Sequence, residues 1–472
     1  MNRTKIIATI GPASWKRQVI KKMIEAGCSV FRLNFSHGNH EIHAANIRNI
    51  RDIATKLNRP IAIIADLQGP KIRTGRLDGE VVQLRRGHKI ELTTKNIIGN
   101  ENRIMVDWPH LPMVAKVGMT ILLSEGRIKL CVLSRSRAGL RCRIVQGGTL
   151  GERKGVNILG IKLRSVLTGK DKRDIKFAVQ HGVDAFALSF IQNASDVVTV
   201  KKYIKRFKEG LPIIAKIEKP EAVYNLGKIL REVDGVMVAR GDLGIEGRLE
   251  KIPIWQKKII REANADTKIV ITATQMLESM ITEATPTRAE VTDVANAIFD
   301  GTDAVMLSGE TAVGKYPVQA VRMMKRIIRS AEKNNIIKYY LDLFNSKEVS
   351  LPFSIAHASI DAAREAQVKA IIVFTLSGFT ARFISERRPQ TPIFALTPNK
   401  SVYNSMSMLW GVYPILIELG KNIDVVIRNG INQIKRRKLL KNGNRAVIVY
   451  GLAEKRGGAD RMRIITIGED GV

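Results

Sequence analysis

Short runs of apolar and β-branched residues recur along the first two thirds of the chain, and each ends in polar residues or glycine. Amphipathic stretches of helix length separate these runs, so the pattern predicts eight strand–helix units. In the stretch after Pro286, Thr287 and Glu290 are spaced for a capping box and Gly301 for a C-terminal cap. The strand runs are KIIATIG (5–11), VFRLNFS (30–36), IAIIADLQG (61–69), AFALSF (185–190), PIIAKIE (212–218), GVMVARGD (235–242), KIVITATQ (268–275) and DAVMLSGE (303–310).

Eight such units predict a (β/α)8 barrel, and the residues that end the strands support this prediction. In barrels of this type the C-terminal ends of the strands form the rim of the active site. We therefore expect one mouth to which nearly every strand contributes polar side chains. These are Arg32, Asn34, Asp66, Ser189, Lys216, Glu218, Asp242, Thr274, Ser308 and Glu310.

Two parts of the chain depart from this pattern. After Gly69, short alternating segments separated by glycine, such as KIELTTK and LRCRIVQGG, predict a small β domain inserted after the third strand. From about residue 345 another α/β unit follows, with a helix at SIAHASIDAAREA and strands at AIIVFTLSG, PIFALTP, NRAVIVYGLA and RIITIGE. The predicted fold class is α/β, a TIM barrel with a small inserted β-barrel domain and a C-terminal α/β domain. The predicted domains are 1–69 with 155–344, 70–154, and 345–472.

Composition changes this picture in one respect. The chain of 472 residues carries a net charge of +33, from 77 Lys plus Arg against 44 Asp plus Glu. Such an excess favours nucleic acid, anionic membrane or phosphorylated metabolites as partners, although a general drift of surface composition explains it as well. Only 5% of residues are aromatic, so platforms for stacking single-stranded bases are sparse.

The cysteines and the N-terminus suggest a cellular location. Cys28, Cys131 and Cys142 show no CxxC spacing, which predicts free thiols in a reducing compartment. The first residues enter a strand pattern without a signal peptide, and no apolar run reaches the roughly 20 residues that span a bilayer. We therefore expect a cytoplasmic, soluble protein with no membrane association.

The expected rim combines carboxylates and cations. Glu218 and Asp242 offer hard oxygens that suit Mg²⁺ or Mn²⁺, and Arg32, Arg73 and Lys216 suit phosphate. Together these residue types describe a phosphoryl-transfer site. Lys216 and Glu218 are also compatible with a purely structural ion pair, which is the alternative interpretation.

A second phosphate site is suggested by TLSGFTARFIS in the C-terminal unit, where a loop leads into a helix. The backbone N–H groups of such a helix start suit a phosphate, but a plain capped helix has the same pattern. The candidate residues are Thr375, Ser377, Gly378 and Thr380.

Two further motifs are weaker. GETAVGKY (309–316) nearly matches a phosphate loop, but Tyr316 stands where a Ser or Thr would hold Mg²⁺. His37, His40 and His43 lack the HExxH pattern of a zinc site, so we interpret them as surface or helix-start residues.

Several long motifs in fixed order carry a family resemblance. They include TKIIATIGPAS, FRLNFSHG, ADLQGPKIRTG, KGVN, IIAKIEKPEAV, VMVARGDLGIE, ITATQMLESMI, PTRAEVTDVANAIFDGTDAVMLSGETAVGKYP and TLSGFTAR. The chain resembles the pyruvate kinase family over essentially its whole length. This resemblance implies transfer of the phosphoryl group of phosphoenolpyruvate to ADP, giving pyruvate and ATP.

The resemblance also implies roles for individual residues. Glu218 and Asp242 resemble ligands of Mg²⁺ or Mn²⁺, and Lys216 resembles the ammonium that stabilises the phosphoryl group in flight. The inserted domain resembles a lid over the nucleotide. The implied catalytic residues are Lys216, Arg73, Thr274, Ser308 and Glu310, the last two in proton delivery; the substrate-binding residues are Arg32, Lys216, Gly241, Asp242 and Thr274; the nucleotide-binding residues are Asn34, His37 and Arg73.

The site for a monovalent cation differs from the common family pattern. Asn34, Ser36, Asp66 and the carbonyl of Leu67 match the family's potassium ligands, but GPKIR replaces GPEIR and places Lys71 there. A lysine ammonium can supply the positive charge of the ion. We therefore expect activity without added K⁺, as in the lysine-containing, potassium-independent subgroup.

The resemblance implies further partners. TLSGFTAR matches the family's effector loop, so we expect a sugar phosphate or a nucleotide to bind there, and the family is usually a homotetramer. Two alternatives remain: a basic nucleic-acid-binding protein on a barrel scaffold, and a non-catalytic paralogue. The presence of Lys216, Glu218, Asp242, Arg73 and Thr274 argues against the second alternative.

Overall fold

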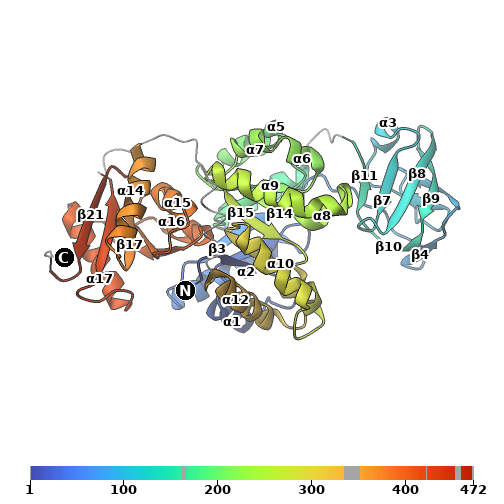
Figure 1. Ribbon diagram of the computed structural model, residues 1–472. Helices are drawn as coiled ribbons and strands as arrows, with labels where there is room; N and C mark the ends of the chain where they lie inside the picture. The colour runs from blue at the N-terminus through green and yellow to red at the C-terminus, as the bar shows by residue number, and fades with distance from the viewer. Residues whose placement is uncertain (1, 162–165, 334–350, 421, 452–458, 470–472) are drawn as a thin grey trace.

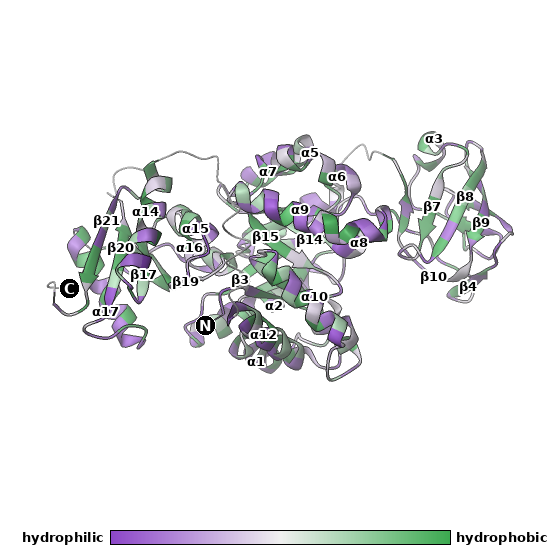
Figure 2. Ribbon diagram, in the orientation of Figure 1, coloured by the Kyte–Doolittle hydropathy of each residue, from purple (hydrophilic) through white to green (hydrophobic). Residues whose placement is uncertain are grey.

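The computed structural model describes residues 2–161, 166–333, 351–420, 422–451 and 459–469 (Figure 1). Figure 1 shows three units in a row, with the barrel in the centre, the inserted β domain at one end and the C-terminal domain at the other. The most apolar residues lie in the barrel strands and in the strands of the C-terminal sheet, whereas the surrounding helices carry many hydrophilic residues (Figure 2).

The central unit is a closed parallel barrel in the order β1-β16-β15-β14-β13-β12-β3-β2, which confirms the eight predicted strands. Apart from the half-buried Arg32 and Asn34, every residue of these strands is buried, because side chains fill the interior and helices cover the outside. The strands are β1 (Lys5–Thr9), β2 (Val30–Asn34), β3 (Ala62–Asp66), β12 (Ala185–Leu188), β13 (Ile213–Ile217), β14 (Gly235–Ala239), β15 (Ile269–Ala273) and β16 (Ala304–Leu307).

Helices follow the barrel strands, and several begin with capping boxes. Thr287 and Glu290 form the predicted capping box, and Gly301 after the same helix has a φ of 97°. Equivalent boxes start the helices after Thr168 and Asn193. The elements are α1 (Arg17–Ala26), α2 (His40–Lys56), α4 (Gly169–Gln180), α5 (Ala194–Lys205), α6 (Pro220–Tyr224), α7 (Leu226–Leu230), α8 (Arg240–Glu246), η1 (Leu249–Lys251), α9 (Ile252–Ala265), η2 (Glu278–Ile281), α10 (Arg288–Phe299), α11 (Gly309–Ala312) and α12 (Pro317–Lys333).

The inserted domain has its own apolar core, formed by residues between Ile72 and Ile161. It contains a six-stranded sheet in the order β11-β7-β8-β9-β5-β6 and a two-stranded sheet of β10 and β4. Because β11 pairs with β7, this sheet continues past residue 154, where the sequence-based boundary lies. The elements are β4 (Val81–Leu84), β5 (Lys89–Thr93), β6 (Arg103–Met105), α3 (Leu111–Val114), β7 (Thr120–Leu123), β8 (Ile128–Arg135), β9 (Gly139–Gln146), β10 (Gly148–Gly151) and β11 (Val156–Ile158).

The C-terminal domain is built on a five-stranded sheet in the order β19-β18-β17-β20-β21, parallel except for β21. The edge strand β19 contains Pro414, which cannot donate to a sheet ladder and is tolerated at an edge. The elements are α14 (Leu351–Glu365), β17 (Ala370–Phe374), α15 (Phe379–Glu386), β18 (Ile393–Thr397), α16 (Lys400–Ser405), η3 (Met406–Met408), β19 (Val412–Leu416), α17 (Ile423–Arg436), β20 (Arg445–Tyr450) and β21 (Arg461–Thr466).

Buried charges join the C-terminal domain to the barrel at the end opposite the expected mouth. Arg388 Nη1 lies 2.8 Å from Asp303 Oδ1, and Arg388 Nη2 donates to the carbonyl of Gly301 at 2.8 Å. The guanidinium also lies 4.9 Å from the ring of Trp410. Both carboxylate oxygens of the buried Glu386 lack a hydrogen-bond partner among the described residues. Arg388 is therefore a buried cation at a junction where two carboxylates are also buried.

Candidate active site

Lys216 is surrounded by oxygen atoms at the C-terminal end of β13. Its Nζ lies 2.8 Å from Glu218 Oε1 and 3.3 Å from Asp66 Oδ1, and it donates to Ser189 Oγ at 2.9 Å. Burial lowers the pKa of the Lys216 ammonium, but the Asp66 and Glu218 carboxylates more than offset this effect and raise it above its ordinary value. The mouth therefore contains a fixed positive charge.

Asp66 also holds Arg32, which points into the same mouth from β2. Arg32 Nε lies 2.6 Å from Asp66 Oδ2, and Arg32 Nη1 donates to Thr9 Oγ1 at 3.2 Å. Burial raises the pKa of Asp66, but the charges of Lys216 and Arg32 outweigh it and leave the pKa below its ordinary value. Asp66 is thus an ionised carboxylate that orients two cations.

Glu218 and Asp242 form the carboxylate pair expected to hold a divalent cation. Glu218 Oε2 accepts a hydrogen bond from Phe190 N at 2.7 Å, and Asp242 lies in the first turn of α8. Burial raises the pKa of Glu218; the Lys216 charge opposes this, and the negative charge of Asp242 adds to it. A cation between the two carboxylates would remove this repulsion. Mg²⁺ is commonly held by one or two carboxylates together with substrate oxygens and water, so this donor set fits it.

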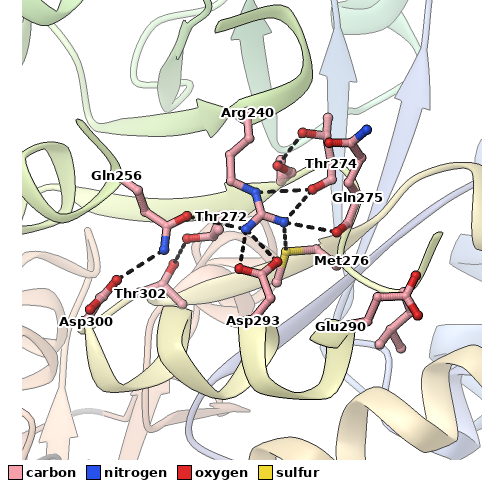
Figure 3. A network of polar contacts seen from close by, with 12 residues as sticks. Arg240, Gln256, Thr272, Thr274, Gln275, Met276, Glu290, Asp293, Asp300 and Thr302 are labelled. Atoms are coloured by element: carbon pink, nitrogen blue, oxygen red, sulfur yellow. Dashed lines mark hydrogen bonds and ion pairs between the residues drawn. The ribbon is translucent and has the colours of Figure 1, made fainter. Parts of the chain in front are cut away.

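Arg240 holds the turn that follows β15 (Figure 3). Its Nη2 donates to the carbonyls of Thr274 at 2.6 Å and Gln275 at 3.2 Å, and its Nη1 pairs with Asp293 at 2.6 Å. Thr274 and Gln275 have φ values of 69° and 52°, a region that costs non-glycine residues of order 1–3 kcal/mol each. The guanidinium stabilises this strained turn, and Arg240 is the residue directly before Gly241 and Asp242.

The hydroxyl of Thr274 links the same turn to the start of α8. Thr274 Oγ1 accepts a hydrogen bond from Gly241 N at 2.8 Å and donates to Ala273 O at 2.6 Å. The family resemblance implies that the backbone N–H groups of Gly241 and Asp242, together with the Thr274 hydroxyl, bind the substrate carboxylate. In this structure the N–H group of Gly241 donates to the Thr274 hydroxyl. A bound substrate carboxylate would replace that hydroxyl as the acceptor of the Gly241 N–H group.

Glu310 lies behind the mouth and is completely buried, at 0% exposure. Its Oε1 accepts from Leu277 N at 3.0 Å and its Oε2 from Ser308 N at 2.7 Å. Burial raises the pKa of this carboxyl, and the backbone hydrogen bonds oppose the rise. Ser308 Oγ is buried and has no hydrogen-bond partner among the described residues. Unlike the Glu310 carboxylate, the Ser308 hydroxyl is therefore available to bond to a ligand.

His37 and Arg73 lie near each other between the barrel and the inserted domain. Burial lowers the pKa of His37, and the charges of Arg73 and Lys71 lower it further, so its imidazole is neutral at neutral pH. Arg73 Nη1 donates to Arg153 O at 3.3 Å, and Arg73 N donates to Asp107 Oδ1 at 2.5 Å. Arg73 is therefore held by the inserted domain, and its charge acts on His37 at the edge of the mouth.

The predicted ligands of a monovalent cation come from the ends of β2 and β3. Asn34 and Asp66 are neighbours in the register of these strands. Asn34 Oδ1 accepts from Ser36 N at 3.1 Å, and Leu67 O accepts from Ser189 Oγ at 2.7 Å. The structure thus groups these four residues.

Lys71 lies on the other side of the linker, toward the inserted domain. It is exposed, and its Cε would lie 3.5 Å from a β-carbon placed on Gly155. Its charge nevertheless reaches His37, whose pKa is lowered first by burial and then by the charges of Arg73 and Lys71. The ammonium therefore contributes positive charge to the mouth from its edge.

The histidine cluster and the near match to a phosphate loop both have structural explanations. His40 Nε2 lies 2.7 Å from Asp174 Oδ1, and the ring of His43 stacks on Phe35 with centroids 4.4 Å apart. Within the described ranges, no three His, Cys, Asp or Glu residues are grouped for a metal ion. In GETAVGKY, a β-carbon on Gly314 would lie 2.5 Å from Glu310 O, so this glycine permits close backbone packing.

The candidate effector loop precedes α15. Gly378 has a φ of 83° and donates its N–H to Thr375 Oγ1 at 2.9 Å. Ser377 Oγ accepts from Phe379 N at 3.4 Å. Thr380 is buried, and its Oγ1 accepts from Ala459 N at 3.2 Å. Thr375 and Ser377 therefore lie in the loop, whereas the Thr380 hydroxyl is used inside the domain.

Fold and mouth together define a phosphotransferase of the TIM-barrel class, with two carboxylates whose oxygens suit a divalent cation and cations whose charge suits phosphate. A family model described as pyruvate kinase, barrel domain, matches residues 1–321, and one described as pyruvate kinase, alpha/beta domain, matches residues 354–465. The chain belongs to the pyruvate kinase family.

Individual relatives agree with this assignment. The pyruvate kinase of Thermococcus litoralis is 44% identical over 99% of each chain. That of Staphylococcus aureus is 40% identical and covers 100% of this chain and 81% of its own length. A solved pyruvate kinase structure from Cryptosporidium parvum is 38% identical, covers 98% of this chain and 96% of its own, and has a TM-score of 0.91. Among the described residues, no helix is long and apolar enough to cross a bilayer.

Proposed function

We propose that the mouth of this barrel transfers the phosphoryl group of phosphoenolpyruvate to ADP, giving pyruvate and ATP. The observation that carries the proposal is the Lys216 ammonium, placed between Asp66 and Glu218 on the same rim as Asp242. Phosphoryl transfer needs little covalent chemistry from the protein and depends on positioning and on charge stabilisation. A buried, permanently charged ammonium beside a divalent-cation site provides both.

The residues around Lys216 have distinct proposed roles. Glu218 and Asp242 would hold Mg²⁺ or Mn²⁺, which when bound neutralises charge on the phosphoryl oxygens. Lys216 and Arg32 face the transferred group, and Asp66 keeps both side chains oriented. These groups are fixed before substrate arrives, so they do not need to reorganise during the reaction.

The enolate formed by the transfer must gain a proton at carbon. Ser308, whose buried hydroxyl has no hydrogen-bond partner in the described part of the chain, is the better placed of the two candidates. We assign Glu310 a positioning role, because both of its oxygens accept backbone hydrogen bonds and its side chain is fully buried. It holds the segment after Thr274 from one side, while Arg240 holds it from the other.

The inserted domain acts as the lid in this proposal. Arg73 lies at the start of that domain and, with Asn34 and neutral His37, would contact the nucleotide. A lid over this position excludes water, which would otherwise compete with ADP for the phosphoryl group.

An assay of pyruvate formation from phosphoenolpyruvate, ADP and Mg²⁺, coupled to lactate dehydrogenase, tests the main proposal. We expect turnover that requires both substrates and is abolished by EDTA. A folded protein without turnover, but with tight and salt-sensitive RNA binding, would instead favour the nucleic-acid alternative raised by the +33 net charge.

The same assay without monovalent cations tests the role of Lys71. We propose that turnover proceeds without added K⁺, because the ammonium adds charge at the edge of the mouth. In a Lys71→Glu variant, turnover is expected to become K⁺-dependent. A wild-type enzyme that is inactive in tetramethylammonium salts and activated by K⁺ would contradict this prediction.

Further proposals concern assembly and regulation. We propose that a sugar phosphate or a nucleotide binds the loop at Thr375, Ser377 and Gly378, and that the protein forms a homotetramer. The left-handed Gly378 at the start of α15, which leaves backbone N–H groups near the loop, supports the first proposal. A cytoplasmic location is supported by three unpaired thiols.

A further inference from the structure

The carboxylate of Glu246 joins three parts of the chain. Its Oε1 accepts a hydrogen bond from Asn157 Nδ2 at 2.7 Å, and its Oε2 lies 3.6 Å from Lys219 Nζ. The side chains of Lys219 and Glu246 are only 5% and 6% exposed. Burial at this depth is uncommon for either charge and makes the cost of losing a partner high.

These residues connect the lid to the metal site. Asn157 lies in β11, the last strand of the inserted domain before the chain returns to the barrel. Glu246 ends α8, the short helix whose first turn carries Asp242. Lys219 directly follows Glu218 in the chain. One hydrogen bond therefore ties the exit strand of the lid to the helix that carries Asp242. The ion pair with Lys219 links the same Glu246 carboxylate to the segment after β13 that carries Glu218.

A second contact supports the lid at the same helix. The turn after β7 contains Ser124, Glu125 and Gly126, with φ values of 50°, 59° and 81°. A β-carbon on Gly126 would lie 3.7 Å from Ile245 Cγ2, so this turn packs against α8 beside Glu246. Because β7 pairs with β11, both contacts belong to one sheet of the lid.

The hydrogen bond from Asn157 helps to keep the buried Glu246 carboxylate ionised. Burial raises the pKa of Glu246; the Lys219 charge and the Asn157 hydrogen bond oppose this, and the negative charge of Glu221 adds to it. An amide donor from the lid therefore helps to stabilise the ionised carboxylate. Rotation of the lid away from α8 would remove that donor.

We infer that the Asn157–Glu246 hydrogen bond, braced by Lys219, is the hinge contact that fixes the orientation of the lid over the divalent-cation site. Asn157 and Glu246 are then positioning residues for nucleotide binding. The expected change in the KM for ADP rests on the proposed function, whereas the expected change in lid orientation does not.

An Asn157→Asp variant tests the hinge, because it places a carboxylate against the Glu246 carboxylate. Like charges this close repel strongly, so we expect the KM for ADP to rise at least about tenfold while the KM for phosphoenolpyruvate changes little. The defect should shrink on acidification, because two adjacent carboxylates can share one proton. Asn102→Asp, the same change on the exposed surface of the lid, is the matched control and should match the wild type.

The double variant Asn157→Asp with Glu246→Gln exchanges the amide and the carboxylate, so the pair keeps one negative charge to balance Lys219, and it should lower the KM for ADP toward the wild-type value. Small-angle scattering and hydrogen exchange of β11 and α8 report the lid independently of activity: both should change in Asn157→Asp and recover in the double variant. If Asn157→Asp does not fold, Asn157→Ala removes the bond without repulsion and should raise the KM for ADP less.

Two results would overturn the inference. The first is a defect that persists in the double variant, and the second is an unchanged lid in folded Asn157→Asp. If the wild-type enzyme lacks kinase activity altogether, the proposed function fails, whereas the scattering and exchange measurements still decide the hinge.

Discussion

Replacing Lys216 with methionine is expected to reduce kcat by about 10³-fold or more while leaving the fold and Mn²⁺ binding intact. Loss of one preorganised charge-stabilising group typically costs about 10²–10³ in kcat, and here the charge faces the transferred group itself. Methionine keeps most of the side-chain volume, so the change mainly removes charge from the mouth. Steady-state kinetics and Mn²⁺ titration by electron paramagnetic resonance measure the two properties separately.

The matched control is Lys5→Met, which removes another buried lysine from the barrel. Lys5 Nζ donates to Val412 O at 2.7 Å at the junction with the C-terminal domain, away from the mouth. This variant should keep the wild-type kcat. If Lys216→Met turned over at the wild-type rate, Lys216 would have no part in the reaction; if it lost Mn²⁺, its role would lie in building the cation site.

Replacing Arg388 with methionine is expected to destabilise the protein by about 3–5 kcal/mol, because it leaves a buried carboxylate without its counter-ion. Asp303, the partner of Arg388, is completely buried, and neither oxygen of the buried Glu386 accepts a hydrogen bond from the described residues. Chemical denaturation followed by tryptophan fluorescence measures the loss, since Trp410 lies against the guanidinium.

The pH dependence of this variant follows from the same carboxyl. Burial already raises the pKa of Asp303 in the folded protein, and removal of the Arg388 charge raises it further. The folded state then binds a proton that the unfolded state releases, so the stability of the variant falls as pH rises from the ordinary carboxyl pKa to the raised one. Arg364→Met, on an exposed pair with Asp361, should change stability by less than about 1 kcal/mol. A similarly small loss for Arg388→Met would show that the junction tolerates the unpaired charge.

The barrel could be predicted from the sequence because each strand is a local signal. All eight apolar runs became barrel strands, since a strand buried on both faces shows as a continuous apolar run. In the C-terminal domain, β19 was not predicted from the sequence, because Pro414 interrupts its apolar run. A strand tolerates proline at the edge of a sheet, and local sequence does not show which strand lies at the edge.

The site could be predicted only where chemistry follows a strand end. Lys216, Glu218 and Asp66 were found in this way, and the structure brings all three into contact. Arg240 and Glu246 were missed, since each acts through a partner more than 30 residues away in the chain. The only local signal was their position in ARGDLGIE, on either side of Asp242.

On a continued strand, Lys219 would lie on the face opposite Lys216, so strand alternation alone gives it no part in the site. The strand ends at Ile217, however, and Lys219 precedes the short helix α6, so strand alternation no longer fixes its direction. Its side chain turns inward to Glu246. The direction of the Lys219 side chain thus depends on the residue at which β13 ends, and sequence patterns define the ends of elements poorly.

The strained turn at Thr274 and Gln275 has a consequence for how this enzyme fails. Its backbone keeps an unfavourable conformation only while Arg240 and Glu310 hold it from both sides. We therefore expect mild heat or denaturant that loosens either contact to let the turn relax before the apolar barrel loses its packing. Activity would then depend on the local equilibrium between the strained and the relaxed turn, in addition to the global stability of the fold. A sample with intact secondary structure could therefore already be inactive.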